Sequence, residues 1–194
     1  MSSKLEWMRQ QFYQMAEPCP EWWTLIGQNQ IDLELVGPHC GIIAVALCKT
    51  YETVDGTTQF DFSANGIPCA VIEANCFRRE NGNLNPYTAD LVAWPFQAPD
   101  SFATALGVGE GCELLGAWNA CRSDRSPLLI HQTPLGWLQS GCDGCVILKP
   151  GAEHWLRNAG GPFICEDAYH ASAIRELLGH RHQILIPNSE RKAA

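Results

Sequence analysis

The sequence is short of basic side chains and has no long hydrophobic run. Its 194 residues include 13 Lys and Arg against 21 Asp and Glu, which gives a formal net charge of −8. The nearest approaches to a basic cluster are Arg78-Arg79 and Arg191-Lys192. Because an acidic surface repels phosphate backbones, we expect no broad nucleic-acid binding. No apolar run approaches the roughly 18 residues of a membrane span, so we expect no membrane insertion.

Complete catalytic motifs are missing as well. The glycine-rich segment 107–111 lacks the spacing and the preceding strand of a phosphate-binding loop, and we interpret it as a helix break. No Gly-x-Ser-x-Gly nucleophile elbow occurs. A metal-dependent phosphotransfer layer would need an Asp-x-Asp pair, and residues 127–179 contain none. The sequence therefore points to no established reaction.

Ten cysteines are present, and the first 17 residues lack the apolar stretch of a signal peptide. We therefore expect a cytoplasmic protein whose thiols are reduced and mostly buried as small hydrophobic side chains. Cys142 and Cys145 form a C-x2-C pair, but no second pair accompanies it as in a zinc ribbon. We interpret this pair as a turn with one buried cysteine. Metal binding by Cys142 and Cys145 stays open as an alternative.

The hydrophobic pattern of the first half predicts one helix followed by an antiparallel β-meander. Apolar residues recur at helical spacing over residues 4–16, and prolines then end that helix. Alternating and apolar runs separated by turn residues follow, and residues 78–85 are polar and are expected to form a loop. The strands are expected at 31–36, 41–51, 58–62, 69–77 and 87–94. Glu73 and Asp90 are expected on the solvent face of this sheet.

The second half predicts a small α/β layer with the order βαβαβα. A proline-containing linker at 95–100 is the candidate boundary, and a helix is expected from residue 101 through 106 and again over 112–120. Apolar runs at 128–131, 145–148 and 163–165 then alternate with helical segments. The expected fold class is α+β. Its expected parts are an N-terminal helix (1–20), a meander (21–95) and an α/β layer (100–187) that share one core.

Glu166, Asp167 and His170 form the most suggestive polar group. They follow the strand expected at 163–165 and open the next helix, and ligands of open α/β sheets collect at the carboxyl ends of strands. Two carboxylates and an imidazole there would suit acid–base chemistry or a divalent metal. The alternative is structural, because acidic residues in a first helical turn complement the helix dipole. His131 ends another expected strand and His154 opens an expected helix, and either is a candidate to join Glu166 in space.

Two functions follow from these observations. The first is a cytosolic binding or inhibitor-type protein that acts through a protein partner. It is favoured by the missing catalytic motifs and by seven tryptophans, a residue enriched at interface hot spots. Trp22, Trp23 and His131 are its candidate binding residues. The second is a small metal-assisted hydrolase that uses Glu166, Asp167 and His170. We expect no cofactor for the first function, and a divalent metal for the second.

Overall fold

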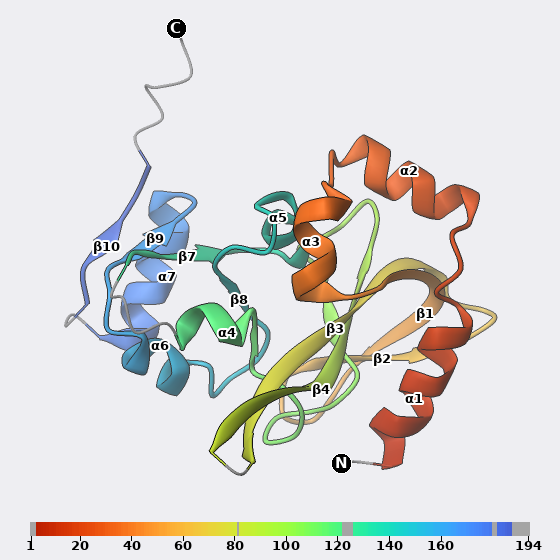
Figure 1. Cartoon of the computed structure of the whole chain (residues 1–194), viewed down its shortest axis with the longest axis horizontal. Helices are drawn as coiled ribbons and strands as arrows, with labels where there is room; N and C mark the ends of the chain where they lie inside the picture. Colours follow the sequence, from red (N-terminus) through yellow and green to blue (C-terminus); the bar gives the residue numbers. More distant parts are fainter. Residues whose placement is uncertain (1–2, 81, 122–125, 180–181, 188–194) are drawn as a thin grey trace, which may run out of the picture.

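The structure is a computed structural model and describes residues 3–80, 82–121, 126–179 and 182–187. It combines helices with two β-sheets, which confirms the α+β class. The first sheet closes into a barrel and the second is an open, mostly parallel sheet. The two lie side by side along the long axis of the molecule (Figure 1).

Three helices precede the first strand: α1 (Ser3–Gln14), α2 (Pro20–Gln28) and α3 (Leu33–Cys40). The position of α1 matches the helix expected from the sequence. The strand expected at 31–36 is wrong, because α3 begins there. Asp32 caps α3 by accepting hydrogen bonds from the backbone N–H groups of Glu34 and Leu35. Val36 and Cys40, four residues apart, are the buried pair of this helix.

The barrel contains β1 (Ile43–Glu52), β2 (Thr58–Phe62), β3 (Ile67–Glu80), β4 (Asn83–Pro95) and β5 (Ala103–Thr104), in the order β1-β2-β5-β4-β3. Antiparallel hairpins join β1 to β2 and β3 to β4. The expected antiparallel meander is corrected to a barrel, because β5 pairs with both β2 and β4. The helix expected over 101–106 is wrong for the same reason. The loop expected at 78–85 is instead the end of the β3–β4 hairpin.

The second sheet contains β6 (Leu114–Leu115), β7 (Leu128–His131), β8 (Cys145–Ile147), β9 (Phe163–Cys165) and β10 (Ile184–Leu185), in the order β10-β9-β7-β8-β6. Only β6 runs antiparallel to its neighbour. Its helices are α4 (Ala117–Ala120), α5 (Pro134–Gln139), α6 (Glu153–Ala159) and α7 (Ala168–Leu178). The helix expected over 112–120 is therefore reduced to the four residues of α4, after β6.

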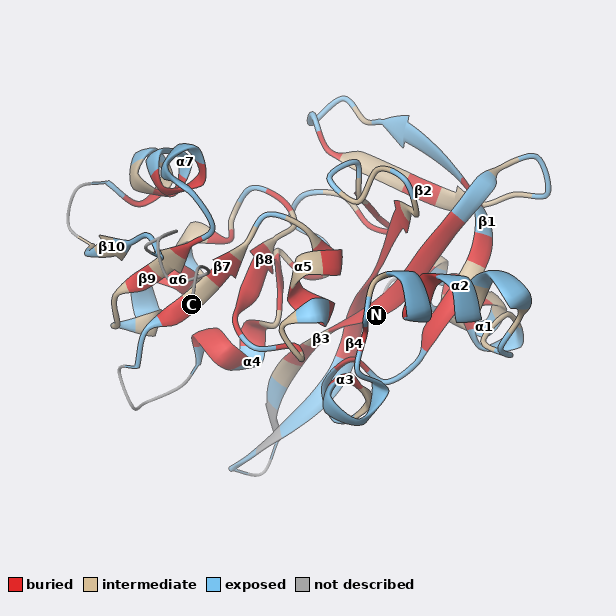
Figure 2. Ribbon diagram, turned by 90° about the horizontal axis from the view of Figure 1, so that it is seen from above, coloured by how far each residue is buried: buried red, intermediate tan, exposed pale blue. Residues whose placement is uncertain are grey.

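Two clusters of apolar side chains make the core. The smaller cluster fills the barrel, and Leu5, Met8 and Phe12 of α1 pack into it. The larger cluster joins α2, α3 and the outer side of β3 and β4 to the second sheet. Figure 2 shows buried segments concentrated where the two halves meet. The strands β3 and β4 are therefore buried on both faces, which determines where polar groups of the barrel lie.

Candidate functional site

The predicted site lies at the carboxyl ends of β7 and β9, two neighbouring parallel strands in the middle of the second sheet. From β7 the chain continues through α5 to β8 on one side of β7. From β9 it continues through α7 to β10 on the opposite side. The two connections diverge at this point, and such a switch in direction is where open α/β sheets bind ligands.

His131 ends β7, and Glu166 and Asp167 follow β9, so the parallel pairing brings them together. The Nδ1 atom of His131 lies 3.3 Å from Oε1 of Glu166. Gln132 binds both carboxylates: its backbone N–H donates to Glu166 Oε1 at 3.2 Å, and its side-chain Nε2 donates to Asp167 Oδ2 at 3.0 Å. The Nε2 atom of His131 lies 3.0 Å from the carbonyl oxygen of Asp143, so both ring nitrogens of this imidazole face hydrogen-bond acceptors.

Asp167 also has a structural role, because it caps α7. Its Oδ1 accepts the backbone N–H of His170 at 2.8 Å, in addition to the Gln132 contact at Oδ2. The backbone hydrogen bond from His170 and the side-chain hydrogen bond from Gln132 lower the pKa of Asp167. Asp167 is therefore held as a carboxylate at the helix N-terminus, as the structural alternative from the sequence proposed.

His170 lies on the first turn of α7 and is 8% exposed. Its Nδ1 atom is buried and has no hydrogen-bond partner among the residues that the structure describes. Burial lowers the pKa of His170, and the carboxylates of Glu166 and Asp167 oppose that shift. The imidazole is thus a neutral group next to two carboxylates, with one polar atom unsatisfied.

Glu166, Asp167 and His170 do not form a metal-binding site in their present positions. Across the described part of the chain, no three His, Cys, Asp or Glu side chains are arranged to hold a metal ion. Glu166 Oε1 is already engaged by His131 and Gln132, and both oxygens of Asp167 accept hydrogen bonds. What the group offers directly is a carboxylate–imidazole pair for proton transfer or for binding a hydrogen-bond donor.

Trp22 and Trp23 lie on α2 and differ in exposure. The Trp22 indole N–H donates to the carbonyl oxygen of Ile43 on β1 at 2.7 Å, and its ring is partly buried. Trp23 is 61% exposed, and its ring packs edge-on against Trp22 with a centroid distance of 4.7 Å. The tryptophan pair is far from His131 in the chain and belongs to a different part of the fold, on α2 against the barrel.

All ten cysteines are free thiols, and most are buried, as expected. The C-x2-C segment is corrected in one respect, because Cys142 and Cys145 are both buried. Cys142 neighbours Cys40, and the two thiols perturb each other's pKa through a hydrogen bond. A second pair, Cys76 and Cys112, has its sulfur atoms 3.1 Å apart.

The solvent-facing positions expected for Glu73 and Asp90 are wrong. Asp90 is fully buried beside Lys149, and Glu73 is 9% exposed. The error follows from the barrel and the second sheet covering opposite faces of β3 and β4. The sequence could have indicated that Glu73 is buried, because this residue interrupts the apolar run of residues 69–74. The involvement of Gln132 was also missed, although it follows His131 at the same strand end.

Comparison with known proteins adds no family to this description. No protein-family model, curated protein or solved structure matches the chain. Among the described helices, none is long and apolar enough to cross a membrane. The functional argument consequently depends on the geometry of the molecule itself.

Proposed function

We propose that this protein is a cytoplasmic binding protein that acts through a protein partner, with Trp23 as its anchor residue. The observation that carries the proposal is that Trp23 is exposed and yet packs against a neighbouring ring. Its indole is largely in solvent, yet it packs against Trp22, which is tied to the β1 backbone. An aromatic side chain that is already ordered loses little conformational entropy on binding, and such residues dominate interface energies.

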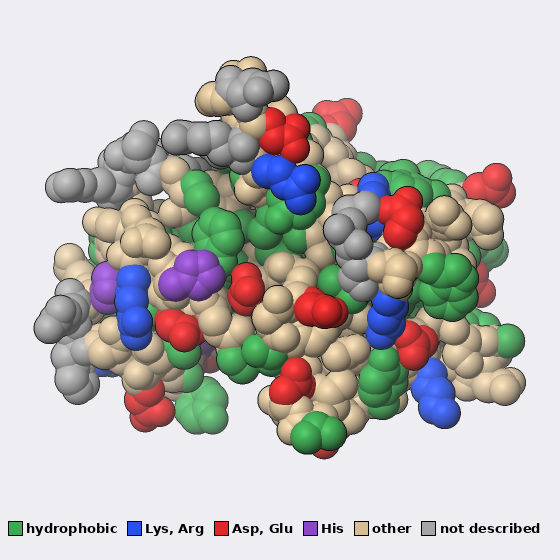
Figure 3. All heavy atoms as spheres, turned by 90° about the horizontal axis from the view of Figure 1, so that it is seen from below, with side chains coloured by type: hydrophobic (Ala, Val, Ile, Leu, Met, Phe, Trp, Pro, Cys, Tyr) green, Lys and Arg blue, Asp and Glu red, His purple; other side chains and the backbone are tan. Residues whose placement is uncertain are grey.

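The charge of the segment that carries this anchor suggests the chemistry of the partner. Residues 10–48, which include α2 and α3, contain Glu17, Glu21, Asp32 and Glu34 but no Lys or Arg. By contrast, acidic and basic side chains are interspersed on the face shown in Figure 3. An apolar recess rimmed by basic residues would complement Trp23 and these carboxylates. Such a partner would associate faster at low ionic strength. The ten free thiols are consistent with a reducing compartment.

The test is co-purification of the tagged chain from cells of its source, in the presence of EDTA, followed by reconstitution with the recovered partner. We expect a stoichiometric complex whose affinity falls as salt rises. Trp23→Ala is expected to weaken it by roughly 2 kcal/mol or more, the scale of an interface hot spot. Trp118→Ala is the matched control, because Trp118 is a half-exposed tryptophan on α4. Recovery of the wild type only as a free monomer, or equal losses for both variants, would contradict the proposal.

Metal-assisted hydrolysis by Glu166, Asp167 and His170 is the second candidate function. The specific observation in its favour is that Glu166 and Asp167 contact His131 and Gln132 at the switch point between β7 and β9. A bound divalent ion would have to displace the present contacts of the two carboxylates. The test is the thermal unfolding of the wild type with Mg²⁺, Mn²⁺ or Zn²⁺, since a ligand of the folded state raises the unfolding temperature.

A control variant separates the metal from the helix cap. Asp167→Asn retains a capping side chain but loses the charge, whereas Asp167→Ala loses both. Metal assistance predicts that either substitution abolishes the metal-dependent shift, while only Asp167→Ala destabilises the metal-free protein. A wild type that shows no shift with any of the three ions rejects the metal-assisted version.

A further inference from the structure

A cavity of about 430 Å³ lies where the barrel meets the second sheet. Its walls come from α3, β3, β6, α4 and α5, which are distant in the chain. The volume lies within the range of small-molecule pockets, and cavities between packed layers are their usual location. It is separate from the β7–β9 switch point, because neither Glu166 nor His131 lines it.

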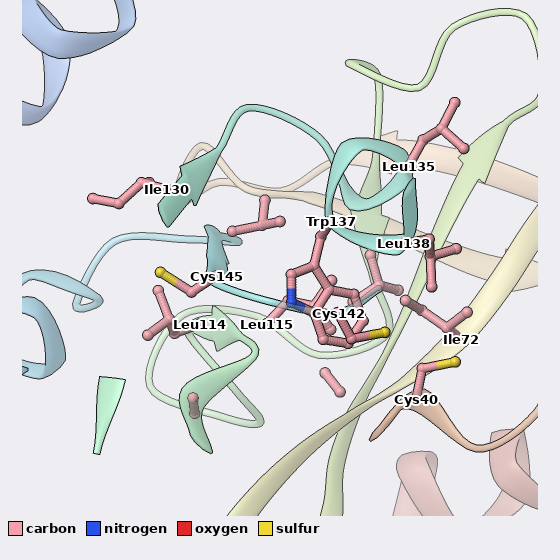
Figure 4. Packing of buried hydrophobic residues seen from close by; sticks show 14 of the residues in the cluster. Cys40, Ile72, Leu114, Leu115, Ile130, Leu135, Trp137, Leu138, Cys142 and Cys145 are labelled. Carbon is pink, nitrogen blue, oxygen red and sulfur yellow. The ribbon is translucent and has the colours of Figure 1, made fainter. Parts of the chain in front are cut away.

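Three aromatic side chains, Phe77, Trp118 and Trp137, line part of the cavity, and hydrogen bonds hold Trp137 and Asn119 in place. The rings of Phe77 and Trp118 lie against each other with a centroid distance of 5.2 Å. The Trp137 indole N–H donates to the carbonyl oxygen of Gly144 at 3.1 Å, and the Asn119 amide donates to the same oxygen at 2.7 Å. Figure 4 shows Trp137 within the packed cluster between the second sheet and the barrel strands. The cavity is therefore preformed and offers flat apolar surfaces.

Glu73 is the one carboxylate in the described lining of this cavity, and its two oxygens have different surroundings. Oε1 accepts hydrogen bonds from the hydroxyl groups of Tyr13 and Thr88, each at 2.7 Å, and lies 3.6 Å from Nε of Arg9. None of those three residues lines the cavity. Oε2 takes none of these contacts and lies next to Gly41, which does line it. The carboxylate is thus anchored from behind and presents its second oxygen to the cavity.

We infer that this cavity binds a small organic cation with a flat apolar body, such as an arylamidine or arylammonium. The positive group would donate hydrogen bonds to Glu73 Oε2, and the body would lie against Phe77, Trp118 and Trp137. Charge-assisted hydrogen bonds and aromatic faces both favour a cation. Arg9 offsets part of the Glu73 charge, but no Lys or Arg belongs to the lining as the structure describes it. The described lining also contains the imidazole of His39, on α3, but Glu73 is its one carboxylate, so an anion would meet the Glu73 charge inside the cavity.

The test compares three probes of nearly the same shape on the full chain: benzamidine, neutral benzamide and anionic benzoate. Binding is measured by calorimetry and by ligand-observed NMR. We expect benzamidine to bind about tenfold or more tightly than benzamide, because it adds a charge-assisted hydrogen bond, and benzoate to bind most weakly. Glu73→Gln is expected to remove the preference for benzamidine while leaving benzamide binding within about twofold of the wild type.

A pair of tryptophan variants controls for the apolar wall. Trp118→Ala is expected to weaken benzamidine and benzamide alike, whereas Trp7→Ala, a half-exposed tryptophan on α1 outside the cavity lining, leaves both unchanged. If Glu73→Gln does not fold, the relative affinities of the three probes for the wild type still test whether the cavity prefers a cation. Absence of benzamidine binding at millimolar concentration, or benzoate binding as tight as benzamidine, overturns the inference. Trp23→Ala should not alter probe binding, so this result is independent of the proposed protein partner.

Discussion

The ammonium group of Lys149 lies 2.6 Å from Oδ2 of Asp90, and both side chains are fully buried. Asp90 belongs to β4 of the barrel, whereas Lys149 follows β8 of the second sheet. Asp90 Oδ1 also accepts backbone N–H groups from residues 91, 105 and 106, and Lys149 donates to the carbonyl oxygens of residues 106, 107 and 110. This pair therefore holds the 105–110 segment, and with it the end of the barrel, against the second sheet.

Replacing Lys149 with Met should destabilise the protein strongly. The substitution leaves the Asp90 charge buried without its partner, which typically costs about 3–5 kcal/mol. The measurement is the free energy of unfolding by denaturant titration. Lys49→Met is the control, because Lys49 is an exposed lysine on β1. The double variant Asp90→Asn/Lys149→Met should be more stable than Lys149→Met alone; additive losses would show that the two groups are not coupled.

A side chain at Gly111 should destabilise the protein, because the Asp90 carboxylate occupies the space next to it. Gly109 and Gly111 both have left-handed backbones, with φ of +76° and +73°. A Cβ at Gly111 would collide with Asp90 Oδ2, whereas a Cβ at Gly109 would meet nothing within 4 Å. Gly109→Ala should cost about 1 kcal/mol for the backbone alone. Gly111→Ala should cost roughly 1–3 kcal/mol more, as overpacking does. Equal unfolding free energies for the two variants would contradict this account.

Regular patterns and clear turns predicted four barrel strands correctly, although the same kind of pattern at 31–36 belongs to the start of α3. The runs that became β1, β2, β3 and β4 alternate or are continuously apolar and are separated by turn residues. Closure of the barrel could not be predicted in this way. It depends on β5, whose two residues Ala103 and Thr104 are too few to show any period. The buried positions of Glu73 and Asp90 depend on the same closure and on the second sheet covering β3 and β4.

The strand-end positions of His131 and Glu166 could be predicted from the sequence, but their meeting could not, because it depends on β7 pairing with β9. His131 and Glu166 end up together once β7 and β9 are neighbours, and both positions are strand ends in the sequence. The position of the aromatic cavity could not be predicted from any pattern in the sequence. Phe77, Trp118 and Trp137 come from three elements that meet only when the barrel packs on the second sheet. The spacing of these three residues along the chain therefore does not indicate that their side chains line one cavity.

Asp32 should determine the start of α3, the helix that the sequence pattern predicted as a strand. Its carboxylate accepts the N–H groups of residues 34 and 35, at 3.0 and 3.4 Å. Asp32→Ala should cost about 1 kcal/mol of unfolding free energy, since these N–H groups lose their side-chain acceptor. Asp32→Asn is the matched control and should be close to neutral, because Asn is an equally good cap. Similar losses for both variants would assign the effect to the charge and not to the cap.

His170 should make the stability of the protein depend on pH near neutrality. Burial lowers its pKa in the folded state below the unfolded value, for which 6.5 is the ordinary figure. The unfolded chain then binds a proton more readily than the folded chain, so acidification favours unfolding. The stabilisation is complete above pH 6.5 and is lost as the pH falls toward and through the lowered pKa. For one such group the slope cannot exceed about 1.4 kcal/mol per pH unit.

The substitution His170→Phe should reduce that slope, because it removes the titrating group while filling similar space. The free energy of unfolding, measured at intervals from pH 7.5 to pH 5, should fall less steeply in His170→Phe than in the wild type. Asp167 does not titrate between pH 7.5 and pH 5, because its pKa is lowered from 3.8. Its contribution to the stability of the fold is lost only in stronger acid. His154→Phe is the control, since His154 is an exposed histidine on α6. If the His170→Phe and wild-type slopes coincide, proton exclusion at His170 does not contribute to stability, and the unsatisfied Nδ1 atom must find a partner in solution.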